Sequence, residues 1–297
     1  MNINMGGIAT LAYDSGTGGY GANAVDNIVP TAWEEIDYGL STGITDLGAV
    51  SASKGVINFA IKAPTAGTGI SFSYTNEVGA GHHADGATGA NNSVTGMDAV
   101  IDFVNYDAAH FGMRFGFAGQ VELQKETCKK SEKVITINSC NAPKKDHPYG
   151  GTSYVTLKLG PLSLGTQATF KDPMDVASTG IKNKRSIVAG AALTFGDTMS
   201  VSYGEAWDRY RYNNACRGGD SAFTSTADDV KCGGSDLDGT GGEYTTTKFS
   251  GWSAAVNFGP VALKGTRNRV GGWGENAGNS GEGLDKHHSE INLSIAF

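Results

Sequence analysis

The chain has no long hydrophobic run. None of its apolar stretches approaches the roughly 18 consecutive residues that a membrane-spanning helix needs, and only 39% of its 297 residues are hydrophobic. A helical membrane protein is therefore excluded. The other structure that spans a bilayer with every backbone hydrogen bond satisfied is a closed barrel of β-strands.

Basic charge is scarce. The 23 Lys and Arg are outnumbered by 30 Asp and Glu, the formal net charge is -7, and no basic block stands out. We therefore expect no nucleic-acid partner. The opening "MNINMGGIAT" has neither the basic start nor the long apolar stretch of a secretory signal peptide. This predicts either a mature form or a chain without its true beginning.

Cysteine is rare and occurs in two local pairs. Cys128 and Cys140 lie in one polar, glycine-containing segment, and Cys216 and Cys232 lie in another. Neither pair has the C-x-x-C spacing of a zinc or redox site. The pattern predicts two loop disulfides and an oxidising compartment. The alternative is four unpaired thiols.

Proline is scarce and glycine is abundant, with 7 and 44 residues. Without a collagen period, this much glycine indicates tight turns and crowded strands rather than helices. Apolar and polar residues alternate with period two, as expected for strands with one apolar face. The twelve candidate strands are 2–13, 56–62, 70–76, 97–106, 110–119, 154–160, 162–170, 186–195, 199–207, 251–258, 261–266 and 290–297.

The predicted strands have short connections at one end and long ones at the other. The pairs Gly160-Pro161, Gly196-Asp197 and Gly259-Pro260 are short turns. The long polar stretches are 14–54, 78–96, 123–151, 171–185, 208–248 and 271–287. Many candidate strands approach nine residues, and at about 3.3 Å per residue and a tilt of about 40° they rise about 23 Å. That height is close to the apolar band of a membrane barrel.

Charge separates the two faces of the predicted strands. The residues assigned to the apolar parity, which include Ile57, Phe72, Phe115, Leu157 and Leu293, are all uncharged, whereas the opposite parity includes Lys62, Arg114, Lys158, Lys264 and Glu290. A Lys or Arg on the lipid side costs roughly 2–4 kcal/mol at mid-depth, so the pattern suits a hydrocarbon exterior. The polar parity suits a water-filled lumen or an ordinary aqueous surface equally.

Aromatic residues lie at the predicted strand ends. Phe195, Phe258 and Phe297 fall at the end with the short turns, and Phe170, Trp207 and Tyr13 fall near the other end. Two aromatic girdles at this spacing are typical of interfacial anchors. The alternative is that they are core aromatics of a soluble protein.

Three segments resemble the general diffusion porins of Gram-negative outer membranes, the alphaproteobacterial type included. "EINLSIAF" resembles the terminal strand whose final Phe serves as the assembly signal, and "GGIATLAYDSG" resembles the strand before the long third loop. "VINFAIKAPTAGTGISFSY" resembles the hairpin after that loop. The resemblance implies a transmembrane antiparallel up-and-down β-barrel, a homotrimer, and contact with outer-membrane lipid and lipopolysaccharide.

On this resemblance, residues 1–297 form a single barrel domain. Residues 14–54 correspond to the constriction loop that folds into the pore, and 123–151 and 208–248 to long extracellular loops that hold the disulfides. The twelve strands match the fifth to the sixteenth of a 16-stranded barrel, so the first four are missing. The alternative is a complete 12-stranded barrel.

The candidate site is a charged constriction. The acidic residues of the inward loop are Asp26, Glu34, Glu35, Asp37 and Asp46, and the basic candidates on the facing wall are Lys62, Arg114, Lys158 and Lys264. Opposed charges across a narrow pore orient polar solutes, and rings of charge set ion preference. The alternative is a solvated acidic loop.

Other chemistry is not expected. Glu34 and Glu35 are adjacent carboxylates, but no nucleophile is anchored beside them, which argues against an enzyme. His82-His83 and His287-His288 lack the spacing and third ligand of a metal site, and we interpret both pairs as solvated loop residues. Loosely bound calcium is the one ion considered, at the loop residues Asp236, Asp238 and Glu243. No resident cofactor is expected.

These features predict a passive channel in the bacterial outer membrane for small hydrophilic solutes and ions. Two alternatives stay open. One is a substrate-selective outer-membrane channel, which a tight cluster of inward Arg and Lys would favour. The other is a secreted all-β binding or adhesion module, which would have a dry core between packed sheets.

Overall fold

Thirteen strands form a single sheet and account for most of the described chain. The computed structural model describes residues 1–14, 22, 25, 28–40, 44, 45, 47, 56–62, 68–78, 94–107, 111–124, 147–173, 181–212, 244–273 and 286–295. The strands are β1 (Asn2–Met5), β2 (Ala9–Asp14), β3 (Val56–Lys62), β4 (Thr68–Val78), β5 (Val94–Asp107), β6 (Phe111–Gln124), β7 (Tyr149–Leu159), β8 (Leu162–Asp172), β9 (Ile181–Phe195), β10 (Met199–Tyr212), β11 (Tyr244–Phe258), β12 (Val261–Trp273) and β13 (Lys286–Ile295).

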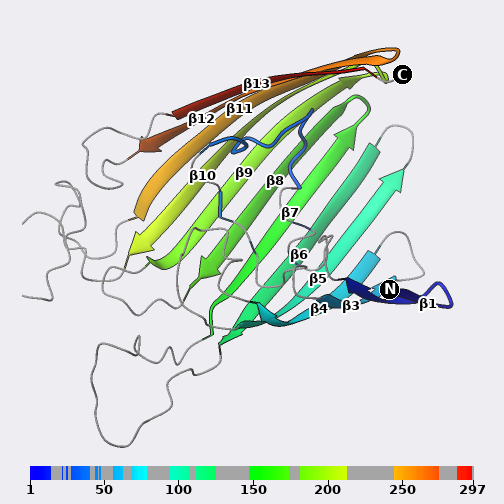
Figure 1. The fold of residues 1–297 in the computed structure, drawn as a ribbon, viewed down its shortest axis with the longest axis vertical. Coiled ribbons are helices and arrows are strands. Elements are labelled where there is room, and N and C mark those ends of the chain that lie inside the picture. The colour runs from blue at the N-terminus through cyan, green and yellow to red at the C-terminus, as the bar shows by residue number, and fades with distance from the viewer. Residues whose placement is uncertain are drawn as a thin grey trace, which may run out of the picture.

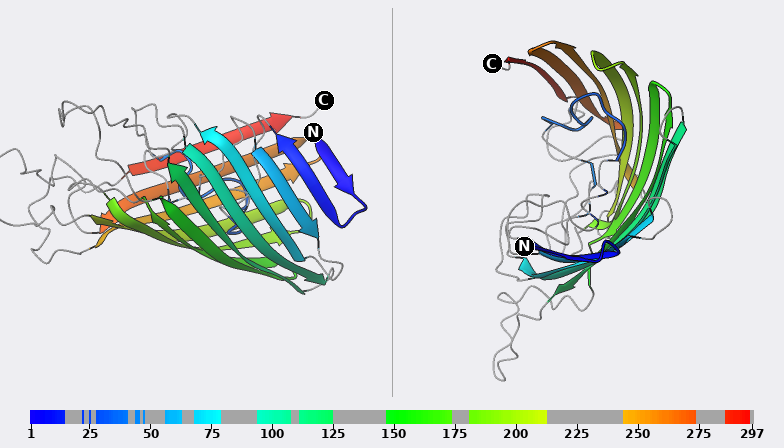
Figure 2. Two further views of the ribbon diagram at one scale, coloured as in Figure 1. Left: turned by 90° about the horizontal axis from the view of Figure 1, so that it is seen from below. Right: turned by 90° about the vertical axis from the view of Figure 1, so that its right-hand side faces the viewer.

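The sheet is an antiparallel meander in which each strand pairs with its neighbours in the sequence (Figure 1). This confirms the predicted all-β, up-and-down class. The sheet curls into an open trough, and Figure 2 shows its two edges, β1 and β13, facing each other across a gap. Among the described strands, β1 pairs only with β2 and β13 only with β12.

The predicted count of twelve strands is wrong. Residues 2–13 form a hairpin, β1 and β2, rather than one strand. Gly6 and Gly7 have left-handed φ angles of 63° and 79° and turn the chain between them, a conformation that glycine adopts without a steric penalty. The odd number has a topological consequence. In an antiparallel meander, β1 and β13 run in the same direction.

The short turns lie where the glycines predict them. Gly160, Gly196 and Gly259 adopt φ angles of 59°, 57° and 58° and each is the first residue of a hairpin turn. Glycine in this position matches the twist of the flanking strands. The strands β1, β3, β5, β7, β9 and β11 are each followed by a short connection in the sequence, and these strands all end at the same end of the trough (Figure 2).

Several strands extend further toward the long connections than the alternation predicts. β10 runs to Tyr212 rather than to residue 207, and β11 begins at Tyr244 rather than at residue 251. The extensions carry charged residues such as Arg209 and Lys248 in the parity that is apolar elsewhere. Charge on that parity hides a strand from a search for apolar alternation, although the ladder continues.

The two faces of the trough differ, but the predicted absence of charge from the outer parity is wrong for β9–β12, where Glu205, Arg209 and Arg267 lie on the convex face. On the convex face, large apolar side chains are exposed: Phe72 is 51% exposed, Phe117 57%, Trp252 62% and Leu293 61%. All the described strands belong to one sheet, so no second sheet formed by described residues covers those side chains. On the concave face, the buried side chains include many polar ones, among them Asn58, Gln120, Thr152 and Ser202.

Candidate functional site

The segment between β2 and β3 lies inside the trough. Its described residues are 22, 25, 28–40, 44, 45 and 47, which we call the inner segment. Figure 2 shows these blue pieces on the concave side of the sheet. Hydrogen bonds tie them to strands from β5 to β12, so the inner segment crosses most of the width of the concave face.

The first part of the inner segment is bonded to β5 and β8. The backbone N–H of Ala22 donates to Asp98 Oδ2 at 2.9 Å. The Gln167 side chain holds two points of the segment at once. Its Oε1 accepts from the N–H of Ile28 at 3.1 Å, and its Nε2 donates to the carbonyl of Val25 at 3.3 Å. Polar wall residues therefore replace the backbone partners that an irregular segment lacks.

The middle part is bonded to two wall serines. The N–H of Ala32 donates to Ser202 Oγ at 2.8 Å, and the N–H of Trp33 donates to Ser253 Oγ at 3.1 Å. The two hydroxyls are themselves 2.8 Å apart across β10 and β11. A serine hydroxyl can both donate and accept a hydrogen bond. The two serines can therefore accept from the N–H groups of the segment and also bond to each other.

The last part reaches β12 and β13. Asn268 Nδ2 donates to the carbonyls of Glu35 and Tyr38 at 2.8 and 3.0 Å, and the Tyr38 ring meets His288 of β13 edge to face at 5.7 Å. The chain then returns, and Thr45 Oγ1 donates to Asp208 Oδ1 of β10 at 2.7 Å.

A row of glycines makes room for the segment. Gly165, Gly190, Gly204 and Gly251 pair directly with one another across β8, β9, β10 and β11. A Cβ atom at Gly190 would lie 2.5 Å from Val29 Cγ1, and one at Gly204 would lie 2.8 Å from Ile36 Cγ2. These distances are shorter than real van der Waals contacts, so a side chain at Gly190 or Gly204 would push the inner segment away from the wall.

Two apolar clusters also hold the segment. Ala22, Val25 and Leu47 pack with wall residues that include Val100 and Tyr154. Ile36 packs with Ala206, Phe249 and Val270. Phe249 and Val270 are fully buried on the concave face, where many of the other buried side chains are polar. Their apolar side chains are explained by contact with the inner segment and not by the alternation of the strands. Alternation alone therefore does not identify them as core residues.

The acidic residues of the inner segment lie near β11 and β12. Asp37 Oδ2 accepts from the N–H of Ile44 at 2.9 Å, which closes the end of the segment on itself. Partial burial, together with the nearby charges of Asp37 and Glu34, raises the pKa of Glu35 to about 7. The predicted residues Asp26 and Asp46 lie outside the described residues.

The predicted basic wall is only partly brought to this site. Arg114 forms an ion pair with Asp102 at 2.7 Å, and the Tyr154 hydroxyl donates to the same carboxylate at 2.7 Å. Asp102 therefore compensates the charge of Arg114 locally, a partner that the sequence analysis missed. Lys158 and Lys264 lie on the concave parity of β7 and β12. For Lys62 the structure describes the backbone in β3 but not the side chain.

Several predicted features fall outside the described residues. These are Cys128, Cys140, Cys216, Cys232, Asp236, Asp238, Glu243, Phe297 and the pair His82-His83. The prediction that His287 and His288 lie in a loop is wrong. Both residues lie in β13, with their side chains on opposite faces. Within the described part of the chain, no group of three or more metal-ligating side chains is present and no helix is long and apolar enough to span a membrane.

Comparison with protein-family models, with curated proteins and with solved structures found no match. The functional interpretation therefore rests on the geometry of the trough and its inner segment.

We expect Gly190→Val to detach the middle of the inner segment. The new side chain would overlap Val29, and overpacking of this kind costs roughly 1–3 kcal/mol. Hydrogen–deuterium exchange of the amides in 28–40 should accelerate about tenfold, because 1.4 kcal/mol corresponds to that factor. Gly271→Val is the matched control, since nothing lies within 4 Å of a Cβ at Gly271. Equal exchange rates in the two variants would contradict the packing role of the glycine row.

Proposed function

We propose that the protein is an outer-membrane porin, a water-filled channel through which small hydrophilic solutes and ions diffuse passively. One observation carries the proposal. A curved up-and-down sheet exposes large apolar side chains on its convex face and holds an irregular, acidic segment against its concave face. An apolar exterior and a polar interior narrowed by an inward segment are what a diffusion pore in a membrane requires.

The direction of the edge strands supports a barrel larger than this sheet. Direct pairing of β13 with β1 would be parallel, because thirteen is odd. Antiparallel closure therefore needs an odd number of further strands between the two edges, whatever chain supplies them. Porin barrels have 16–18 strands, and 16 minus 13 leaves three, one fewer than the sequence predicted. The alternative of a complete 12-stranded barrel is wrong, because the described residues form thirteen strands.

The charges at the inner segment favour cations. Glu34, Glu35 and Asp37 lie together on one side of the trough. On the opposite wall Arg114 is already compensated by Asp102. Glu34, Glu35 and Asp37 concentrate acidic charge at this part of the segment, and rings of acidic side chains are the usual basis of cation preference. Lys158 and Lys264, on the concave parity of β7 and β12, oppose that preference. The homotrimer and the outer-membrane lipid contacts that the resemblance implies belong to the same proposal.

The direct test is conductance across a planar lipid bilayer. We expect protein that is folded in detergent, with heat-modifiable migration, to produce stepwise increments of current. A heat-denatured sample of the same preparation is the control. If well-folded protein inserts no conducting unit, the channel proposal is wrong.

Ion selectivity should depend on pH through Glu35. With its pKa raised to about 7, this carboxylate is mostly protonated at pH 6 and mostly ionised at pH 8. A unit charge about 7 Å from a passing ion in water changes the energy of that ion by roughly 0.6 kcal/mol, so the cation permeability should fall about threefold from pH 8 to pH 6. Reversal potentials in a KCl gradient measure this change.

Two variants separate Glu35 from other carboxylates. Glu35→Gln should give the low selectivity of pH 6 at both values of pH. Asp197→Asn removes an exposed acid in the β9–β10 turn and should keep the pH dependence. A pH step that survives in Glu35→Gln would assign the titration to another group.

Membrane placement predicts opposite outcomes for neighbouring residues of β4. Phe72 lies on the convex face and Ser71 on the concave face. Phe72→Arg should reduce the stability of the protein folded in lipid vesicles by roughly 2–4 kcal/mol, because it places a charge in hydrocarbon. Ser71→Arg should leave it nearly unchanged, since its guanidinium would face water. Similar losses in both variants would argue against a lipid-facing convex wall.

A further inference from the structure

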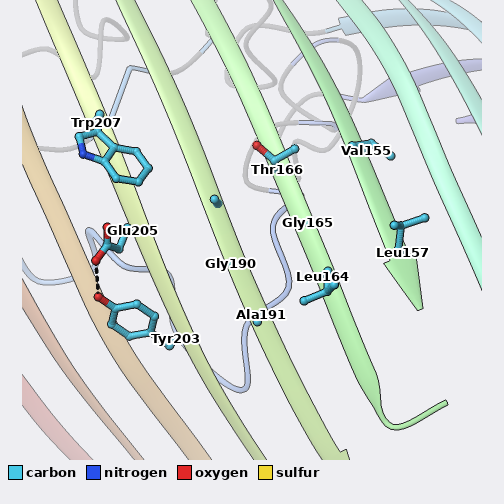
Figure 3. Close-up of a pocket in the computed structure, with 11 residues that line it drawn as sticks. Val155, Leu157, Leu164, Gly165, Thr166, Gly190, Ala191, Tyr203, Glu205 and Trp207 are labelled. Carbon is cyan, nitrogen blue, oxygen red and sulfur yellow. Dashed lines mark hydrogen bonds between the residues drawn. The ribbon is translucent and has the colours of Figure 1, made fainter. Parts of the chain in front are cut away.

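Asn268 continues the glycine row onto β12. The row crosses β8–β11 and ends at Gly251, whose direct partner on the next strand is Asn268. Figure 3 shows two members of the row, Gly165 and Gly190, which also line an apolar groove of about 450 Å³ on the convex face. Four positions of the row therefore lack a side chain where the inner segment passes, and the fifth supplies an amide.

The Asn268 amide is buried and engaged at both ends. The residue is only 1% exposed. Its Nδ2 donates to the carbonyls of Glu35 and Tyr38 at 2.8 and 3.0 Å, and its Oδ1 accepts from Thr266 Oγ1 at 3.3 Å. Two carbonyl oxygens can only accept, so the end of the amide that faces them must be the NH₂ group. The orientation of this side chain is therefore determined by its partners.

Both of these carbonyls belong to one turn of the inner segment. The N–H of Tyr38 donates to the carbonyl of Glu35 at 3.2 Å, and the N–H of Leu40 donates to the carbonyl of Asp37 at 3.1 Å. Asn268 thus binds the first and the fourth residue of the turn 35–38 at once. Ser202 and Ser253 bind other, uncharged parts of the segment. Of these three wall residues, only Asn268 bonds to the peptide of an acidic residue.

The other side of the turn packs on β13. Gly39 has a left-handed φ angle of 73°, and a Cβ atom there would overlap the His288 ring. The Tyr38 ring contacts the same imidazole edge to face, and His288 is the cross-strand partner of Asn268. Ring contacts allow a group to slide, whereas hydrogen bonds are directional. The amide therefore fixes the position of the turn more closely than the imidazole does.

The position of the turn sets the surroundings of the Glu35 carboxylate. Its side chain reaches water, yet burial is the largest cause of its raised pKa, ahead of the charges of Asp37 and Glu34. The concave residues of β11 are uncharged. The titratable side chains on the concave parity of the other strands near the turn are Asp208 and Tyr210 of β10, Lys264 of β12, and Lys286, His288 and Glu290 of β13.

We propose that Asn268 is a positioning residue for ion selection, because its two hydrogen bonds hold the turn that carries Glu35 and so fix the place of that charge in the pore. The inference rests on the channel function proposed above. Asn268 need not touch a passing ion, since it is buried beneath the turn. It acts through the backbone of Glu35 and not through a charge of its own.

Asn268→Leu tests the inference, because it keeps a branched side chain of the same reach and removes both donors. A buried carbonyl without a partner is unfavourable, so the turn should leave the wall and Glu35 should become hydrated. Burial raises the pKa of Glu35, so hydration lowers it and the carboxylate stays ionised at pH 6. The roughly threefold fall in cation permeability from pH 8 to pH 6 should therefore disappear and return at lower pH.

This outcome differs from that of simple damage to the pore. A destabilised barrel would insert less often but would keep the same pH profile in the channels that form. Glu35→Gln should give low selectivity at both values of pH, with no step due to Glu35 at any pH. In the double variant Asn268→Leu with Glu35→Gln, the step at lower pH should be smaller than in Asn268→Leu alone. An equal step in these two proteins would overturn the inference.

Gly251→Ala displaces the amide without removing it. The added Cβ would overlap Asn268 Oδ1, so the pH profile should change as in Asn268→Leu. This variant also tests the inference if Asn268→Leu does not fold. Two controls should keep the original profile. Gly271→Ala adds a Cβ that meets nothing within 4 Å, and Asn292→Leu removes an exposed amide from the concave parity of β13.

Hydrogen–deuterium exchange separates this inference from the channel proposal. In detergent-folded protein, the amides of Tyr38 and Leu40 should exchange about tenfold faster in Asn268→Leu and in Gly251→Ala, because the turn opens more often. Conducting variants with an unchanged pH profile would overturn the role of Asn268 and leave the porin proposal intact. Unsubstituted protein that does not conduct would refute the porin proposal, whatever the exchange rates are.

Discussion

Alternation along the antiparallel ladder is the constraint on which the rest of this structure depends. Each strand sends successive side chains to opposite faces, and the uninterrupted pairing from β1 to β13 decides which residues of neighbouring strands share a face. A slip of one residue would exchange the faces of a strand. The continuous register therefore keeps the residues of each face together across thirteen strands.

The inner segment depends on that register at nearly every point. Four glycines in one cross-strand row remove side chains where the segment passes, and Gln167, Ser202 and Asn268 supply hydrogen bonds beside the row. Apolar wall residues such as Phe249 and Val270 are buried where Ile36, Leu40 and Ile44 pack against the wall. Wall and segment thus form one packed unit. We infer that the narrowing of the proposed pore is set by this packing and by the charges of Glu34, Glu35 and Asp37.

The outer surface has two different parts. The convex wall of β1–β7 presents only uncharged side chains among those described, as a hydrocarbon environment requires, whereas the wall of β9–β12 adds arginines and a groove. In the proposed membrane position, the charges concentrate toward the end with the long connections.

The sequence by itself determined the strand class, the short turns and the apolar parity, because period-two alternation and Gly-Pro or Gly-Asp turns are local signals. It also predicted that residues 14–54 fold inward, through resemblance. Only the tertiary structure decided the count of thirteen, the pairing of Arg114 with Asp102, the alignment of the glycine row and the position of Asn268 at the end of that row. Each of these depends on which residues of separate strands lie opposite one another, and register between strands is a property of the assembled sheet rather than of any short segment.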